Sequence, residues 1–165
     1  MARFNHILVP VDFEDSSQEA LNEAIELALA SDAKLTLVHS WETPYAYAGM
    51  LYAPVDLWTP VEQAAREQLE STLAGARKRL PRAEAILAKG PAAAEVLAVA
   101  SRVKADLIVM GTHGRHGVGR VFLGSAAERV VRSSTVPVLT IRAKQPGQAP
   151  TPVATGTLGA SRGAS

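Results

Sequence analysis

The amino-terminal part of the chain pairs a short apolar run with a segment whose apolar residues recur at helical spacing. Residues 4–12 (FNHILVPVD) form a nearly continuous branched run, which is typical of a strand covered on both faces in a parallel sheet. Ser16 and Glu19 then stand at capping-box spacing, ahead of apolar residues that recur every three or four positions. The pattern predicts a strand followed by a helix that ends near Ser31.

The same alternation continues as far as residue 142. We predict further strands at KLTLVHSW, AEAILAKG, DLIVMG and VPVLTIR, which begin at Lys34, Ala83, Asp106 and Val136, and further helices over 61–80, over 91–104 and from Gly124. Pro137 removes a backbone donor, so we expect the last strand to lie at an edge of the sheet. Residues 42–60 lack clear periodicity and are predicted to form a long loop.

Strands that alternate with helices predict an α/β fold, an open five-stranded parallel sheet with helices on both faces. Parallel neighbours need right-handed helical crossovers, so this arrangement is Rossmann-like. With the strand order 3-2-1-4-5, the first and fourth strands lie side by side where the winding reverses, and ligands bind beyond such strand ends. Pro10 and Asp12 close the first strand while Met110 and Gly111 close the fourth, so we expect these residues to share one crevice.

Composition and charge narrow the possible functions. The 165 residues fit one domain, and a net charge of +1 provides no large field for binding nucleic acid. The chain has no cysteine, which excludes disulfides and thiolate metal sites, and no apolar run is long enough to cross a membrane. We expect a cytoplasmic protein with a domain over residues 1–142 and a flexible tail over 143–165, rich in Pro, Gly, Ala, Ser and Thr.

The stretch GTHGRHGVGRVFLGSAAE, which begins at Gly111, combines several glycines with basic residues before the last predicted helix. Glycine-rich backbone can wrap an anion, and a helix N-terminus offers unpaired N–H groups. Ser125 can add a hydroxyl, while Arg115 and Arg120 can supply charge, so phosphate is the predicted guest. The alternative is that the glycines only permit turns and that Ser125 only caps a helix.

Better-known phosphate motifs do not match this chain. The dinucleotide fingerprint needs glycines after the first strand, where DFEDSS stands instead. A P-loop needs Lys and then Ser or Thr after Gly119, where Arg120 and Val121 occur. A receiver-type phosphorylation switch needs a carboxylate at the end of the third strand, where Lys89 and Gly90 lie.

Taken together, these segments resemble the universal stress protein family. Gly111, Gly114, Gly124 and Ser125 match its ATP-binding pattern of G-x-x-G, nine residues and G-S. ILVPVDF, LTLVHSW, DLIVMGTHG and SSTVPVLTIR are similar to other segments of the family, and the resemblance covers residues 4–142. It implies the ATP-binding branch of the family, with an adenine nucleotide alpha-hydrolase-like fold.

The resemblance also implies a set of ligand contacts, to ATP or alternatively ADP or AMP, with Mg²⁺ as an associated metal. Pro10, Val11 and Asp12 would lie against the adenosine, with the Asp12 carboxylate facing ribose hydroxyls or the metal. Ser40 would flank adenine, and Met110 would pack near the base or sugar. The implied contacts around the phosphates are Gly111, Thr112, His113, Gly114, Arg115, Gly124, Ser125 and Ala126.

The resemblance implies a stress-related nucleotide sensor or regulator that forms a homodimer through its fifth strand. Two alternatives stay open: a slow ATP hydrolase or phosphotransferase using the same site, and a nucleotide-free interaction module. Phosphoryl transfer needs a positioned base and a well-held metal, and Asp12 is the obvious carboxylate in the crevice, so no catalytic residue is predicted. His39 and the basic run over residues 77–82 are interpreted as structural and solvated, respectively.

Overall fold

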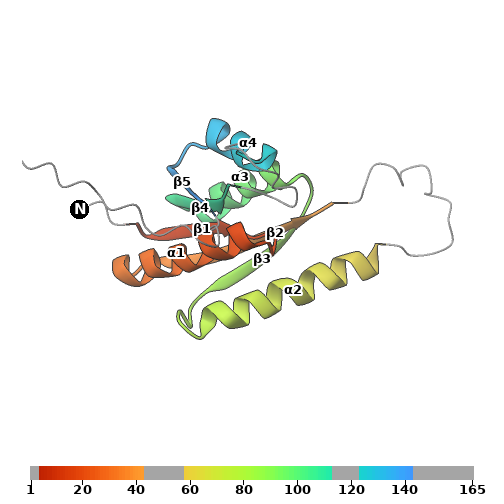
Figure 1. The fold of residues 1–165 in the computed structure, drawn as a ribbon, viewed down its shortest axis with the longest axis horizontal. Helices are drawn as coiled ribbons and strands as arrows, with labels where there is room; N and C mark the ends of the chain where they lie inside the picture. The colour runs from red at the N-terminus through yellow and green to blue at the C-terminus, as the bar shows by residue number, and fades with distance from the viewer. Residues whose placement is uncertain (1–3, 43–57, 113–122, 143–165) are drawn as a thin grey trace, which may run out of the picture.

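A parallel sheet at the centre of the molecule confirms the predicted fold class and strand order. The computed structural model describes residues 4–42, 58–112 and 123–142. Within these ranges, five strands lie in the order β3-β2-β1-β4-β5, which places β5 at an edge as Pro137 predicts (Figure 1). The strands are β1 (His6–Pro10), β2 (Lys34–Trp41), β3 (Glu84–Lys89), β4 (Leu107–Gly111) and β5 (Val138–Ile141).

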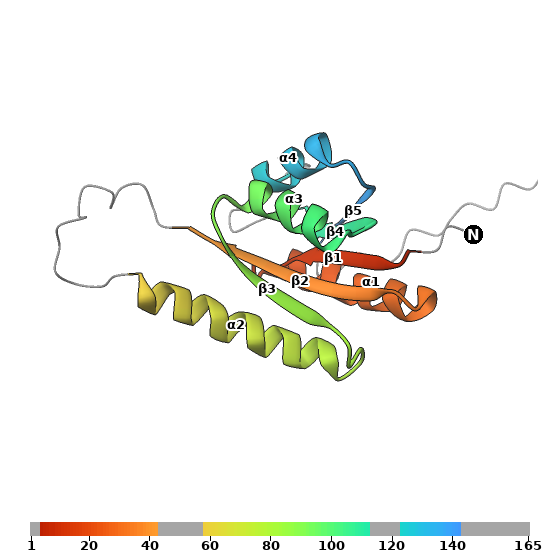
Figure 2. The same ribbon diagram turned by 180° about the vertical axis from the view of Figure 1, so that it is seen from behind.

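Helices cover both faces of the sheet, as the alternation of elements predicts. The described helices are α1 (Asp15–Ser31), α2 (Thr59–Arg77), α3 (Ala92–Val103) and α4 (Ser125–Ser133). Figures 1 and 2 show α1 and α2 on one face and α3 and α4 on the other. Because alternate strand residues point to opposite faces, Ile7 and Val9 of β1 pack under α1 and α2, while Leu8 packs under α3 and α4.

The start of α1 differs from the capping-box prediction, while its end agrees. The helix begins at Asp15, so Ser16 lies inside the first turn and is not the N-cap. Ser17 Oγ instead donates to the carbonyl oxygen of Glu14 at 3.0 Å. At the other end, α1 stops at Ser31, and Asp32 takes the left-handed conformation that often follows a helix.

Two predicted segments fall largely outside the described residues. Residues 43–57 of the predicted long loop and the whole predicted tail, 143–165, are not described. Among the helices that are described, none combines the length and the apolar character needed to span a membrane.

The basic run over residues 77–82, which begins at the last residue of α2, makes contacts within the chain. Arg79 pairs with Glu26, Arg82 pairs with Asp32, and Arg77 Nε donates to the carbonyl oxygen of Ala83 at 2.9 Å. The two ion pairs lie at the surface, where such pairs stabilise a fold only slightly. The run therefore faces solvent, as its interpretation as a solvated face predicts, and ion pairs compensate the charges of Arg79 and Arg82.

At the amino ends of the strands, the Asp106 carboxylate fastens β1 to β4. It accepts hydrogen bonds from the Asn5 backbone N–H at 2.8 Å, from Asn5 Nδ2 at 3.0 Å and from the His6 backbone N–H at 3.0 Å. Partial burial alone would raise the pKa of Asp106, but these hydrogen bonds outweigh burial and lower it. The ionised form of Asp106 thus holds the amino ends of β1 and β4 together.

Asp106→Asn should lower the free energy of unfolding at neutral pH by about 1 kcal/mol, because a charged acceptor of several hydrogen bonds is lost. A lowered folded-state pKa stabilises the fold above the ordinary value of 3.8, and this contribution disappears as the pH falls through the lowered pKa. Urea unfolding between pH 7 and pH 3 should therefore show the two proteins converging in acid. A difference that is constant with pH would contradict this assignment.

Gly111, at the end of β4, permits α1 to pack very close to the sheet. A Cβ at this position would lie 2.7 Å from the backbone carbonyl carbon of Ser16 and 2.9 Å from its oxygen. Those atoms belong to the first turn of α1, so the helix would have to move. Gly111 is therefore required by packing, whatever it contributes to a ligand site.

Gly111→Ala should lower the free energy of unfolding by about 1–3 kcal/mol, the usual cost of overpacking a close contact. Gly75→Ala is the matched control, because Gly75 lies within α2 and a Cβ there would meet nothing within 4 Å. The control should gain about 0.5–1 kcal/mol from reduced chain entropy. Chemical denaturation of both variants measures the difference, and an unchanged stability for Gly111→Ala would show that the contact is loose.

Candidate functional site

A cavity of about 210 Å³ opens at the carboxyl ends of β1, β2 and β4. It is lined also by the first turns of α3 and α4, so it lies on the face of the sheet that these helices cover. The strands β1 and β4 are neighbours here, at the point where the winding of the sheet reverses. This is the place where open α/β sheets bind their ligands.

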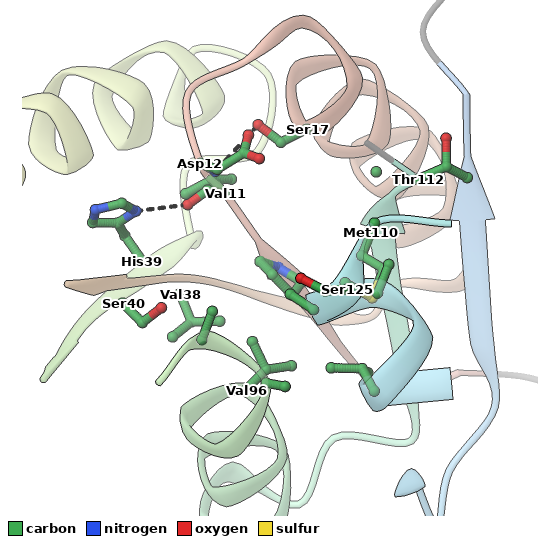
Figure 3. A pocket seen from close by; sticks show the side chains of 18 residues that line it. Val11, Asp12, Ser17, Val38, His39, Ser40, Val96, Met110, Thr112 and Ser125 are labelled. Atoms are coloured by element: carbon green, nitrogen blue, oxygen red, sulfur yellow. Dashed lines mark hydrogen bonds between the residues drawn. The ribbon is translucent and has the colours of Figure 1, made fainter. Parts of the chain in front are cut away.

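The inner part of the cavity is apolar. Figure 3 shows Val38 of β2, Met110 of β4 and Val96 of α3 around the same space. All three side chains are buried, and Val130 of α4 joins them. Small alanine side chains on α3 and α4 also line this part, so it suits an apolar group of a ligand.

Polar groups line the rest of the cavity and come from several elements. Asp12 and Ser17 lie near one another in the β1–α1 segment, and Ser40, Thr112 and Ser125 come from the ends of β2 and β4 and from the start of α4 (Figure 3). Asp12 Oδ1 accepts a hydrogen bond from the Glu14 backbone N–H at 3.0 Å. Asp12 is the acidic residue among the described lining residues.

Two helices begin at the cavity with N-cap residues that provide no side-chain hydrogen bond. Gly124 precedes α4 and Pro91 precedes α3, and neither provides a capping hydrogen bond from a side chain. The Gly124 backbone N–H donates to the carbonyl oxygen of Thr112 at 2.7 Å, so this donor is already engaged. The first turn of a helix has N–H groups without partners inside the helix, and at α4 these belong to Ser125 and the residues after it.

His39 also lines the cavity, and its ring is hydrogen-bonded. Its Nδ1 donates to the carbonyl oxygen of Val11 at 2.7 Å, because a carbonyl can only accept (Figure 3). The ring lies against Phe13, with 4.4 Å between ring centroids and a tilt of 39°. These contacts agree with the interpretation of His39 as a structural histidine.

Each predicted site residue that the structure describes lines this one cavity. These residues are Pro10, Val11, Asp12, Ser40, Met110, Gly111, Thr112, Gly124, Ser125 and Ala126. The remaining predicted contacts, His113, Gly114 and Arg115, lie outside the described residues.

Further lining residues were not predicted from the sequence. They are Ser17, Val38, His39, Ala92, Ala93, Val96, Ala127 and Val130. Because side chains alternate along a strand, Val38 lies on the same face as Ser40, so Val38 could have been predicted from the sequence pattern. The lining residues of α3 could not be predicted in this way, because the apolar spacing within a helix does not indicate which strand ends the helix covers.

The cavity by itself provides few metal ligands. Among the residues that the structure describes, no group of three or more His, Asp or Glu side chains is placed to hold a metal ion. Magnesium is commonly bound by one or two carboxylates together with substrate phosphates. Asp12 therefore fits a metal only if the ligand supplies further oxygens.

Sequence comparison identifies close relatives over almost the whole described domain. The model of the universal stress protein family matches residues 3–142. A universal stress protein from Thermus aquaticus, described as lying in the QAH/OAS sulfhydrylase 3' region, is 37% identical over 139 residues and covers 84% of this chain and 99% of the relative. Universal stress protein A homolog 1 of Coxiella burnetii is 33% identical over 145 residues, covering 86% and 99%.

Solved structures share the fold. UspA from Lactobacillus plantarum has a TM-score of 0.72 at 26% identity, over 86% of this chain and all (100%) of that one. A universal stress protein in complex with cAMP has a TM-score of 0.65 at 23% identity, covering 87% and 100%. One from Archaeoglobus fulgidus in complex with dAMP has a TM-score of 0.61 at 22% identity, covering 86% and 99%. Because the family model spans nearly all the described residues and relatives exceed 30% identity, the chain belongs to the universal stress protein family.

Proposed function

We propose that the cavity binds an adenine nucleotide, with ATP as the ligand, and that the protein is a stress-related nucleotide-dependent regulator acting in the cytoplasm. One observation carries the proposal: the apolar part of the cavity is bordered both by the first turn of α4, whose N-cap Gly124 has no side chain to cap it, and by the Asp12 carboxylate. A base, a sugar and a phosphate chain need these three environments side by side.

The lining residues support one proposed placement of the nucleotide. The base lies in the apolar part of the cavity against Val38, Val96 and Met110, with Ser40 at its edge. The Asp12 carboxylate accepts hydrogen bonds from ribose hydroxyls, and the first-turn amides of α4 from Ser125 onward hold phosphate oxygens.

The size of the cavity favours a nucleotide of which only part is enclosed. Its 210 Å³ lies below the roughly 300–1,000 Å³ of typical small-molecule sites, so we expect it to enclose the nucleoside while the phosphates lie at the start of α4. The resemblance to the family implies further phosphate contacts from Gly114, which belongs to its pattern, and from its neighbours His113 and Arg115. Magnesium would be shared between Asp12 and the phosphates, because Asp12 is a single carboxylate.

The two structural neighbours with cAMP and dAMP support an adenine ligand on this fold. ADP and AMP are the alternatives to ATP, since all three share the adenosine and differ only beyond the first phosphate. Mass spectrometry of the ligand released from gently purified protein identifies which one is bound. A regulator is expected to change its conformation or its partners with that nucleotide state.

Ala92→Phe should weaken ATP binding at least about tenfold, because a large ring placed in the first turn of α3 fills the cavity that Ala92 lines. Ala94→Phe is the matched control: both alanines are exposed in the same helical turn, and Ala94 does not line the cavity. Isothermal titration calorimetry should show ATP affinity within about twofold of the wild type for the control. Equal affinities in the two variants would place the nucleotide elsewhere.

We further propose that two copies associate through β5. This strand forms one edge of the sheet, so the backbone groups on its outer side lack partners within the sheet. Leu139 on β5 is 38% exposed, and Val131 on the neighbouring α4 is 46% exposed. A twofold axis beside β5 would bring both strands and these apolar side chains together.

Leu139→Asp should shift the protein from dimer to monomer at micromolar concentration, because it places charges on both sides of the proposed axis. Val61→Asp provides the control, since Val61 is similarly exposed, at 44%, but lies on α2 beside the other half of the sheet. Sedimentation velocity distinguishes the two states. A wild-type protein that sediments as a monomer would refute the dimer without affecting the nucleotide proposal.

A further inference from the structure

We propose that His39 is a positioning residue that holds the Asp12 carboxylate toward the cavity, so that the site distinguishes ribose from sugars that lack hydroxyls. The inference rests on the proposed nucleotide function and assigns to His39 a role in it. Asp12 lies in the backbone segment between β1 and α1, between two residues that His39 contacts.

The backbone at this turn is strained. Phe13 has a φ of 68°, in the left-handed region that residues with large side chains rarely adopt. Such a conformation persists only where the surrounding contacts determine it, and these conformations cluster at functional sites. The contacts that hold Phe13 in this conformation therefore also affect the position of its neighbour Asp12.

His39 contacts the chain on both sides of Asp12. Its Nδ1 donates to the carbonyl oxygen of Val11 at 2.7 Å, and its ring lies against the ring of Phe13 at 4.4 Å. The Val11 N–H is itself bonded to the carbonyl oxygen of Val38 on β2 at 2.9 Å. Because His39 belongs to β2, the turn is anchored to the neighbouring strand before and after Asp12.

The remaining contacts of Asp12 come from the start of α1. Its backbone N–H donates to Ser17 Oγ at 3.3 Å, and its Oδ1 accepts from the Glu14 N–H at 3.0 Å. Figure 3 shows Ser17 beside Asp12 and His39 on the other side of Val11. The main chain and one carboxylate oxygen are held in this way, and within the described parts of the chain Oδ2 is the oxygen that remains for a ligand.

A preformed acceptor of this kind improves selectivity, because little ordering is needed when the ligand binds. If the turn were free to rotate, the carboxylate would be solvated and would prefer ribose hydroxyls only weakly over water. A histidine that only joined β1 to β2 would support the fold without affecting this preference. The ratio of affinities for ATP and 2′,3′-dideoxy-ATP therefore separates the two roles.

The experiment compares these two nucleotides by calorimetry in the full-length protein. The wild type should prefer ATP by about tenfold or more, the effect expected for hydrogen bonds to a charged acceptor. His39→Phe keeps an aromatic ring but removes the donor, and it should reduce the preference to about threefold or less. Asp12→Asn should do the same, whereas His39→Asn restores a donor near the Nδ1 position and should recover part of the preference.

A second variant keeps the test valid if His39→Phe fails to fold. Phe13→Gly removes the ring and relieves the left-handed strain, because glycine adopts positive φ freely. Relief of this strain offsets part of the packing that the Phe13 ring contributes against the core, so the variant should stay folded and still lose the preference for ATP. Thermal unfolding followed by circular dichroism provides the stability measurement for every variant.

Three results would overturn the inference. If His39→Phe binds both nucleotides more weakly with an unchanged ratio, His39 only supports the fold, and nucleotide binding itself stands. If the wild type binds the two nucleotides equally, Asp12 does not read the sugar, and again the proposed function stands. If the wild type binds neither nucleotide, the proposed function fails and the inference fails with it.

Discussion

The pairing of β1 with β4 is the constraint on which the rest of the structure depends. From β1 the chain crosses to β2 through α1 on one face, and from β3 it returns to β4 through α3 on the other. At the carboxyl ends of these strands, residues at the starts of α3 and α4 border the cavity above the paired strands. Asp106 fastens these strands at their amino ends, and Gly111 permits the close approach of α1 at their carboxyl ends.

In this arrangement, two glycines of the family's phosphate-binding pattern have structural roles apart from any ligand. Gly111 belongs to the family's phosphate-binding pattern, yet a Cβ there would collide with the backbone of Ser16 before any ligand is considered. The N–H of Gly124 is engaged by Thr112 and so ties the start of α4 to the end of β4. Part of the pattern is therefore explained by packing, and the amides of the helix that follows are the natural anion donors.

The fold could be predicted from the sequence almost completely, because apolar periodicity reports directly on which face of an element is buried. Pro137 indicated the edge strand, and the residues ending the first and fourth strands were correctly placed in one crevice. The start of α1 was predicted wrongly, since Ser16 has capping-box spacing but the N-cap is Glu14, two residues earlier. The contacts of His39 could not be predicted, because they depend on a register that pairs Pro10 with Val38 and on the unusual φ of Phe13.

That register joins the stability of the sheet to the geometry of the site. Holding Phe13 in a left-handed conformation destabilises the turn by about 1–3 kcal/mol, and contacts with β2 must offset this cost for the turn to persist. The contacts that do so, through Val11 and the His39 ring, flank the residue that carries the carboxylate. The strained conformation next to Asp12 is thus stabilised by β2, the strand that also supplies Val38 and Ser40 to the cavity. The same strand therefore positions both the apolar part of the cavity and the Asp12 carboxylate beside it.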